Sequence, residues 1–417
     1  MPAHFPPWTL APFVLLVLAI AVLPVASPRA WARPAVQVGV ALAAALPVVG
    51  HALWAGAGNA LAHTAREYGS FIVTIAALYV VSGGVRLTGD LVATPRTNVA
   101  FVALGALLAS LVGTTGASVL LIRPLLATNR QREHKAHLVP FFLVAVANAG
   151  GMLTPLGDPP LLIGYVQGVP FGWTLGLWPF WLLYVGVAVA LLWVVDARAW
   201  ARESAAARER DRAEREPLAI AGRGNVVALA AIVAASLLPS PAREGVLVAL
   251  ALVSWRVTPR ALHAANELTL GPLVEVAVLF AALFATLVPV GATLARAAPT
   301  LPLHHAWQFF WSVGSLSAVL DNAPAYAAFA ALARGLGAGH APLVAGVREP
   351  LLIAISVGSV VMGATTYIGN APNLIVKAIA ERARHPMPSF ARYALFAFAV
   401  MLPAHLVTTL ALVLMDR

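Results

Sequence analysis

Cysteine is absent from the sequence, and charged residues are scarce in it. The absence of cysteine excludes disulfides, thiolate metal sites and cysteine nucleophiles. Asp, Glu, Lys and Arg make up only 11% of the 417 residues, whereas soluble domains average about 25%, and 60% of the chain is hydrophobic. This composition excludes a water-soluble fold, and repeated apolar runs of about 20 residues predict an all-α polytopic membrane protein.

Residues that membrane-embedded enzymes need are also missing. The sequence has no His-Glu-x-x-His motif, which a zinc protease of that class requires. Gly116-Ala-Ser118 resembles the surroundings of a nucleophilic serine, but no histidine stands at a clear mid-span position to act as its base. We therefore expect a protein that is not an enzyme and that carries no cofactor.

The net charge of +10 comes mainly from arginine-rich loops. In a membrane protein such loops set the orientation and contact anionic lipids, so nucleic acid is not an expected partner. The longest polar segment, from Asp196 to Pro217, interleaves six arginines with six acidic residues. It is expected to form a solvated cytoplasmic helix with ion pairs four residues apart.

Apolar length predicts about ten membrane-spanning helices. They are expected at residues 8–25, 35–56, 69–88, around 148–163, 172–195, 218–238, 245–257, 267–295, 349–383 and 392–415. Two further apolar stretches, 98–129 and 306–334, are interrupted at Gly113–Ser118 and Leu320–Pro324. Each arm is too short for a full crossing, so both stretches are predicted to be re-entrant hairpins with polar tips at mid-membrane.

The distribution of basic loops predicts how the spans are oriented in the cytoplasmic membrane. If the charged linker 197–217 is cytoplasmic, the other basic loops also fall on the cytoplasmic side and both termini lie outside. Residues 1–196 and 218–417 then form two inverted repeats of five spans and one hairpin each. The hairpin 98–129 enters from the cytoplasmic side and the hairpin 306–334 from the outer side.

Two interrupted motifs occupy corresponding positions in these halves. Thr154-Pro-Leu-Gly-Asp-Pro-Pro-Leu-Leu-Ile163 aligns with Thr366-Tyr-Ile-Gly-Asn-Ala-Pro-Asn-Leu-Ile375. Irregular backbone at membrane depth is tolerated only inside protein or beside a watery cavity. Paired broken helices of this kind are typical of the binding site of a secondary transporter, whereas a receptor or scaffold would not need them.

Polar residues near the two hairpin tips and the two breaks are the candidate ligands for a proton or a sodium ion. Hard cations prefer oxygen ligands from carboxylates, amides, hydroxyls and backbone carbonyls. The candidates are Thr114, Thr115, Ser118, Asn148, Thr154, Gly157, Asp158, Asp321, Asn322, Thr366, Gly369, Asn370 and Asn373. No metal site is expected beyond these sodium sites.

Asp158 is the leading candidate for a carboxylate that binds either a proton or a cation, as exchange requires. The alternative is that Asp158 only caps the helix that starts at Pro159, and Asp321 has the same alternative as a hairpin-tip cap. Arg123 and Lys377 are expected either to balance the charge of these acids or to bind an anionic substrate.

These motifs resemble those of the ion transporter superfamily, which includes NhaD-type sodium/proton antiporters, ArsB-type pumps and sodium-coupled citrate or dicarboxylate symporters. The resemblance rests on Gly113–Pro124, Asn148–Pro160, Leu320–Tyr326 and Gly363–Asn373 and covers nearly the whole chain. It is strongest to the bacterial branch named for citrate transport or sodium:proton antiport. It implies inverted repeats, hairpins that meet helix breaks, elevator-type alternating access and a homodimer.

One departure from the superfamily bears on the substrate. The dicarboxylate symporters carry Ser-Asn-Thr at both hairpin tips, whereas here the tips contain Gly113-Thr-Thr-Gly-Ala-Ser118 and Leu320-Asp-Asn-Ala-Pro324. An aspartate at one tip disfavours an anionic substrate. The sequence therefore favours sodium (or lithium)/proton antiport, with a sodium- or proton-coupled citrate or dicarboxylate symporter as the alternative. The expected partners are a monovalent cation, a proton and the lipid bilayer, with a small carboxylate in the case of symport.

Overall fold

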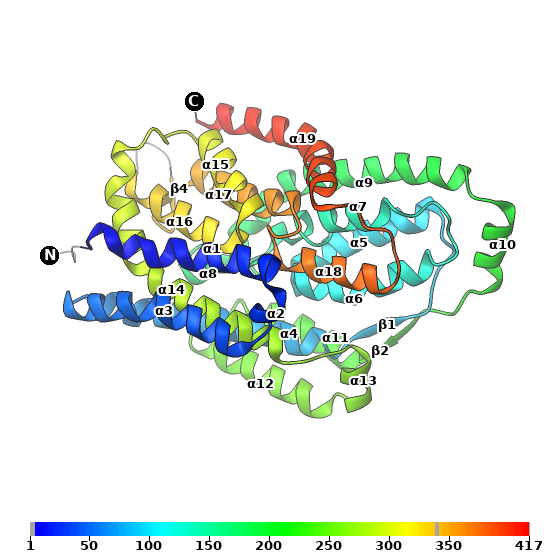
Figure 1. The fold of residues 1–417 in the computed structure, drawn as a ribbon, viewed down its shortest axis with the longest axis horizontal. Helices are drawn as coiled ribbons and strands as arrows, with labels where there is room; N and C mark the ends of the chain where they lie inside the picture. The colour runs from blue at the N-terminus through cyan, green and yellow to red at the C-terminus, as the bar shows by residue number, and fades with distance from the viewer. Residues whose placement is uncertain (1–4, 338–341, 417) are drawn as a thin grey trace.

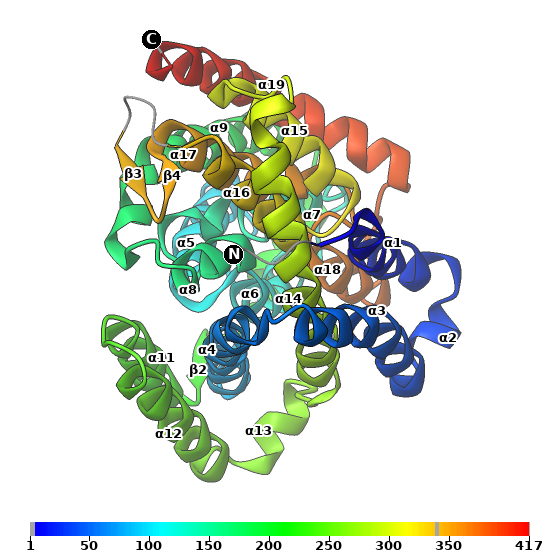
Figure 2. The same cartoon turned by 90° about the vertical axis from the view of Figure 1, so that its left-hand side faces the viewer.

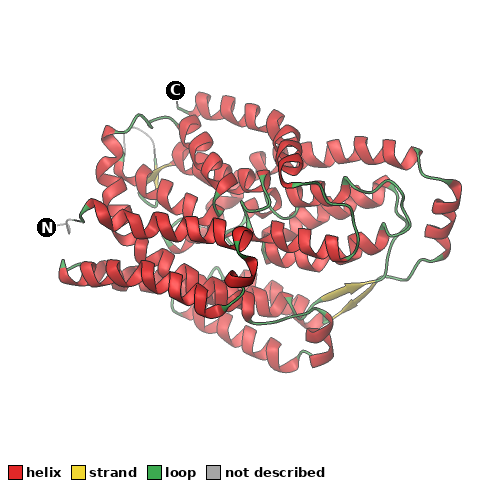
Figure 3. Cartoon of the chain, viewed as in Figure 1, coloured by secondary structure: helices red, strands yellow, loops and turns green. Residues whose placement is uncertain are grey.

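Helices form nearly all of the secondary structure, as Figures 1 and 3 show. The computed structural model describes residues 5–337 and 342–416. The first part of the chain forms α1 (Ala11–Ala26), α2 (Pro28–Trp31), α3 (Pro34–Trp54), α4 (Gly58–Ser82), α5 (Pro95–Val112), α6 (Thr114–Thr128), α7 (Leu138–Ala145), α8 (Pro159–Val166), α9 (Trp178–Ala201) and α10 (Ala205–Ala213). The second part forms α11 (Arg223–Ala235), α12 (Ala242–Val257), α13 (Arg260–Ala265), α14 (Gly271–Ala297), α15 (Ala306–Val319), α16 (Asn322–Gly335), α17 (Glu349–Met362), α18 (Ala371–Arg382) and α19 (Phe390–Met415).

Several of these helices have the length and composition of membrane spans. Within the described ranges six segments qualify: Pro7–Pro24, Pro34–Trp54, Pro95–Val112, Phe171–Ala201, Gly271–Thr300 and Phe390–Met415. Shorter apolar helices occur at Thr114–Thr128, Leu138–Leu153, Arg223–Ala235 and Glu349–Thr365. The chain is therefore an all-α multi-pass membrane protein, and the total of ten crossings stays a prediction.

The long helix α14 joins the two parts of the chain. It contacts α3 and α4 from the first part of the chain and α16 from the second. The helices α11, α12 and α13 lie along one edge of the molecule in Figure 2, where α11 and α12 pack against α4. In Figure 1 the N-terminus lies at the opposite end of the molecule from α10.

The two stretches predicted as hairpins each form a pair of neighbouring helices. Helix α5 ends at Val112 and α6 begins at Thr114, with Gly113 between them at a φ of 85°, a conformation that glycine adopts without strain. The far ends of this pair meet, because the side-chain amides of Asn98 and Asn129 donate to each other's oxygen at 3.0 and 2.8 Å. The pair therefore folds back on itself. Helices α15 and α16 also pack together, on either side of Leu320 and Asp321.

The two interrupted motifs form broken helices with matching backbone. The first break joins α7 to α8 through the 3-10 helix η2 (Ala149–Leu153), and the second joins α17 to α18 through η5 (Gly363–Thr365). Thr154 (φ −136°, ψ 158°) and Thr366 (φ −131°, ψ 165°) have nearly the same conformation. Asp158 (φ −145°, ψ 142°) and Asn370 (φ −154°, ψ 137°) also agree. The equivalence of the motifs thus extends from sequence to local geometry.

Two predicted spans, 69–88 and 218–238, have wrong boundaries. Helix α4 starts earlier, at Gly58, and ends at Ser82, and the chain continues into β1 (Arg86–Thr88), which pairs antiparallel with β2 (Ala219–Ala221). Gly222 follows β2 at a φ of 78°, and a side chain there would collide with the carbonyl of Gly84. Hydropathy alone misses this contact because it forms between segments far apart in sequence. A second short pair, β3 (Leu343–Val344) and β4 (Val347–Arg348), precedes α17.

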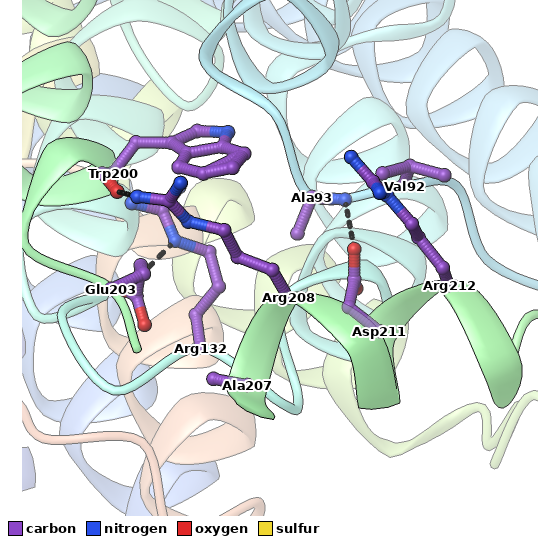
Figure 4. A pocket seen from close by; sticks show the side chains of 9 residues that line it. All are labelled: Val92, Ala93, Arg132, Trp200, Glu203, Ala207, Arg208, Asp211 and Arg212. Atoms are coloured by element: carbon purple, nitrogen blue, oxygen red, sulfur yellow. Dashed lines mark hydrogen bonds and ion pairs between the residues drawn. The ribbon is translucent and has the colours of Figure 1, made fainter. Parts of the chain in front are cut away.

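The acidic residues of the charged linker are not all solvated, which corrects the sequence prediction. Arg132, in the segment after α6, is 5% exposed and pairs with Asp196 Oδ1 at 2.6 Å and Glu203 Oε1 at 3.2 Å. Figure 4 shows Glu203 beside Arg132 and Asp211 beside the backbone of Ala93, whose N–H donates to the Asp211 carboxylate at 2.9 Å. Alternating charge predicts a solvated helix, and the buried arginine that attracts these acids lies elsewhere in the sequence.

Glu203 shows how this network is stabilised. Burial raises the pKa of Glu203, but hydrogen bonds from the backbone N–H groups of Glu133 and His134 and the charge of Arg132 outweigh it, so that the pKa is lower than usual. The carboxylate is therefore held ionised and fixes the segment after α6 to the end of α9.

Candidate functional site

The carboxylate of Asp158 lies at the meeting point of both helix pairs and both breaks. Asp158 is 1% exposed. Its Oδ1 accepts from Thr114 Oγ1 at 2.8 Å and from Asn370 Nδ2 at 3.1 Å, and its Oδ2 accepts from Asn322 Nδ2 at 2.6 Å. Thr114 begins α6, Asn322 begins α16, and Asn370 precedes α18. Four segments, two from each part of the chain, thus converge on one carboxylate.

The two breaks are also joined by asparagine side chains. Asn148 Nδ2 donates to Asn373 Oδ1 at 2.8 Å, and Asn370 Nδ2 lies 3.2 Å from Asn148 Oδ1. Asn373 Nδ2 donates to the carbonyls of Gly363 and Thr366 at 3.0 and 2.9 Å. All three asparagines are at most 1% exposed. Buried amides require such partners, so this network holds the two breaks in one fixed arrangement.

Glycine permits the chain to approach itself closely at each break. A side chain at Gly157 would collide with the carbonyl of Gly151, and one at Gly369 would lie 2.6 Å from the carbonyl of Gly363. This packing brings the Gly157 carbonyl to the tip of the first helix pair, where it accepts from the backbone N–H of Thr114 at 2.7 Å. Both predicted glycines therefore position the centre through their backbone.

The hydroxyl groups of Thr154 and Thr366 have matching contacts to the backbone. Thr154 Oγ1 donates to the carbonyl of Ser110, and Thr366 Oγ1 donates to the carbonyl of Ala318 at 2.5 Å. Each oxygen also accepts a backbone N–H within its own break. Because these hydroxyls are already used, we assign both threonines to fixing each break against its helix pair.

The two candidate aspartates have different roles. Asp321 Oδ1 accepts from the Ala323 backbone N–H at 3.3 Å and caps α16, which agrees with the structural alternative for this residue. Asp158 occupies the cap position of α8, but its carboxylate makes no capping hydrogen bond. Its three donors are side chains of other segments, so capping alone does not explain Asp158.

Two further oxygens at the helix tips have no partner among the described residues. They are Asn322 Oδ1 and Ser118 Oγ, and both side chains are fully buried. Asn322 Oδ1 belongs to the same amide that donates to Asp158, and Ser118 lies one helical turn after Thr114 on the same face of α6. Amide and hydroxyl oxygens are ligands that hard cations accept. Thr115 is half-buried, and its hydroxyl makes no hydrogen bond within the described part of the chain.

Arg123 and Lys377 lie away from this centre, which corrects the expectation that they balance its charge. Arg123 is nine residues beyond Thr114, about 14 Å along a helix, and pairs with Glu267 Oε2 at 3.0 Å. Lys377 pairs with Glu381 Oε1 at 2.6 Å on its own helix. In the residues that the structure describes, neither forms an ion pair with Asp158 or Asp321.

Two buried polar residues escaped the sequence analysis, and one of them, Ser110, positions the first break. Ser110 Oγ donates to the Gly150 carbonyl and accepts from the Leu153 N–H, so it holds η2 against α5. His405 lies fully buried in the middle of α19, which corrects the statement that no histidine occupies mid-span. It bonds to the Tyr184 hydroxyl at 2.8 Å and not to Ser118, so it does not form a serine–histidine pair. A lone polar residue within an apolar run is the signal in both cases.

The fold and this centre together define a class of protein. Many apolar helices surround a buried polar centre built from two broken helices, an arrangement typical of secondary transporters. The chain matches the family described as "Putative citrate transport" over residues 2–413 and belongs to that family. A comparison with curated proteins gives no match.

Proposed function

We propose that the protein is a secondary active transporter in which Asp158 binds the coupling cation, sodium or a proton, and that its cargo is a small carboxylate of the citrate class. The observation that carries this proposal is the convergence of Thr114, Asn322 and Asn370 on one buried carboxylate. The family supports the choice of cargo.

The three donors explain why the carboxylate is suited to coupling. Each hydrogen bond to an ionised carboxylate stabilises it, yet an unpaired charge at membrane depth is costly. A proton or a cation relieves that cost, and the two exclude each other at the same oxygens. The unpartnered oxygens of Asn322 and Ser118 would add ligands for sodium beside Asp158.

Sodium (or lithium)/proton antiport is the second candidate. It is favoured by the composition of the centre, because within residues 5–337 and 342–416 the donors to Asp158 are two amides and a hydroxyl, and none of them is a guanidinium or ammonium group that would bind an anion. The citrate class is preferred as cargo because the family description names it.

The proposal includes a membrane arrangement. Residues 1–196 and 218–417 form two inverted repeats of five crossings, linked by 197–217, and the pairs α5–α6 and α15–α16 are re-entrant from opposite sides. Both termini lie on the outer side of the cytoplasmic membrane. A homodimer provides a static scaffold against which the centre moves in an elevator-type cycle.

Transport by purified protein in liposomes tests the function. We expect an imposed sodium or proton gradient to drive uptake of labelled citrate, and Asp158→Asn to abolish the dependence on the gradient. Asp90→Asn is the matched control, since Asp90 is also buried but accepts from the backbone N–H of Glu216 in the linker. Sodium-induced collapse of a pH gradient without citrate uptake would select antiport instead. Unchanged coupling in Asp158→Asn would remove Asp158 from the mechanism.

A further inference from the structure

A basic cavity lies at the far ends of α6 and α18, away from the Asp158 centre. Its volume is about 400 Å³, within the range of roughly 300–1,000 Å³ that small-molecule sites occupy. Its walls come from α6 and the segment after it, the segment after α13, and the end of α18 with the residues that follow. Figure 1 shows α18 beside α6 towards the end of the molecule that carries α10, the predicted cytoplasmic end.

The cavity wall carries an excess of positive charge. Arg123, Arg130, Lys135 and Arg382 line it, and Glu267 is the acidic residue among the lining groups. Part of this charge is engaged elsewhere, because Arg130 pairs with Glu214 at 3.2 Å and Lys135 Nζ donates to the Arg130 carbonyl at 2.6 Å. The remaining guanidinium groups, those of Arg123 and Arg382, face Glu267.

Glu267 shows that this pair of arginines can hold a carboxylate. Its Oε2 lies 3.0 Å from Arg123 Nη2 and 3.8 Å from Arg382 Nη1. The Glu267 side chain is 64% exposed and that of Arg382 is 77% exposed, and exposed ion pairs contribute little to stability. A ligand with several carboxylates can therefore place one of them between the two arginines and displace Glu267 at a small cost in free energy.

A buried polar atom in the wall also lacks a partner. His385 lines the cavity and is 5% exposed, and its Nε2 has no hydrogen-bond partner among the described residues. Buried polar atoms are normally paired, but this nitrogen is closed off from the cavity, so the His385 ring forms part of the wall without itself marking a ligand contact.

We propose that this cavity is an anion-binding vestibule for a small multivalent carboxylate, one group of which replaces the Glu267 carboxylate between Arg123 and Arg382. The choice of carboxylate rests on the proposed function, whereas the site itself rests on the cavity and the two guanidinium groups. Arginine binds carboxylates through paired N–H groups, and several such groups around one cavity favour an anion with several charges. The vestibule would raise the local concentration of cargo at the predicted cytoplasmic end.

Equilibrium binding of labelled citrate to the full-length protein tests the vestibule without transport. The protein is held in nanodiscs of phosphatidylcholine, and Asp158→Asn is included as a background that removes coupling at the centre. We expect Arg382→Gln to weaken citrate binding about tenfold and Glu267→Gln to strengthen it several-fold, because the competing carboxylate is gone. Arg384→Gln is the matched control, since Arg384 is exposed on the same turn but does not line the cavity.

The outcomes separate this inference from the proposed function. Citrate binding that persists in Asp158→Asn and follows this order of affinities supports the vestibule even if transport assays fail. Equal binding by the Arg382→Gln and Arg384→Gln variants, both with unchanged thermal unfolding, would overturn it. So would co-purification of anionic phospholipid that is lost only in Arg382→Gln, with no citrate binding, since the cavity would then be a lipid headgroup site.

Discussion

Replacement of Thr114 by valine tests the hydrogen-bonded state of Asp158 most directly. Thr114 is 1% exposed, and its hydroxyl donates to Asp158 Oδ1 at 2.8 Å. Valine has nearly the same shape and keeps the backbone N–H that donates to the Gly157 carbonyl at 2.7 Å. The substitution therefore removes one donor to the carboxylate and little else.

The size of the effect follows from that one hydrogen bond. A hydrogen bond to a charged group contributes about 1.5–3 kcal/mol, which corresponds to a factor of roughly 10–150 in an equilibrium constant. Without this donor the protonated carboxyl is favoured over the cation-bound carboxylate by the same factor. We expect the sodium concentration for half-maximal transport to rise at least tenfold near neutral pH and to recover as the pH is raised.

The assay is initial uptake, or collapse of a pH gradient, against sodium concentration at a series of pH values in liposomes. Thr286→Val is the matched control, because Thr286 is fully buried but its hydroxyl donates to the carbonyls of Ala282 and Leu283 within α14. An apparent sodium affinity in Thr114→Val that equals those of wild type and Thr286→Val at every pH would refute the reasoning.

Three further predictions concern stability, measured by thermal unfolding in detergent. Gly157→Ala should lower the free energy of unfolding by about 1–3 kcal/mol or more, because the added methyl group collides with the Gly151 carbonyl. Gly176→Ala is the control, since Gly176 has open space around it and the change should be tolerated. Equal melting temperatures of the two variants would contradict the close approach. Arg132→Gln leaves Asp196 and Glu203 buried without their cation and should lower the free energy of unfolding by about 3–5 kcal/mol. Arg198→Gln, at an exposed position, should change it little. Similar melting temperatures of the two variants would show that the ion pairs of Arg132 are not needed for stability. Burial, together with the charges of Lys135 and His137, lowers the pKa of His385 to about 4. The folded protein therefore keeps His385 neutral where the unfolded chain binds a proton, so up to about 3 kcal/mol of the free energy of unfolding is present above pH 6.5 and is lost as the pH falls towards 4. His385→Gln should flatten this loss while the exposed His63→Gln should not, and a parallel decline in all three proteins would exclude His385 as its source.

The positions of the two helix breaks could be predicted because their signal is local. Glycine, proline and a carboxylate or amide within an apolar run mark a break wherever they occur, and the breaks at 154–158 and 366–370 lie where they were expected. Contacts between distant segments carry no such signal. The pairing of β1 with β2 and the burial of Asp196 against Arg132 depend on which surfaces meet, and neither hydropathy nor charge pattern encodes that.

The different roles of the two aspartates could not be predicted for the same reason. Asp158 and Asp321 each precede a helix, so a capping role was open for both of them in the sequence. The structure separates them because the carboxylate of Asp158 faces the side chains of Thr114, Asn322 and Asn370. Those donors come from 44, 164 and 212 residues away in the chain. Tertiary packing thus decides the role that local propensity leaves open.

The difference between Asp158 and Asn370, which occupy equivalent positions in the two breaks, also follows from what surrounds them. Asp158 faces three donors, whereas the two hydrogens of Asn370 Nδ2 are shared among three acceptors: the Ala147 carbonyl at 3.2 Å, Asn148 Oδ1 at 3.2 Å and Asp158 Oδ1 at 3.1 Å. A carboxylate at position 370 has no hydrogen to donate and would face three acceptor oxygens. An amide at position 158 would carry no charge, and its NH₂ group would face the donor groups that now surround the carboxylate. The two positions share a backbone conformation but not an electrostatic environment. The motifs are therefore not interchangeable, and this hydrogen-bonded network holds its carboxylate at 158.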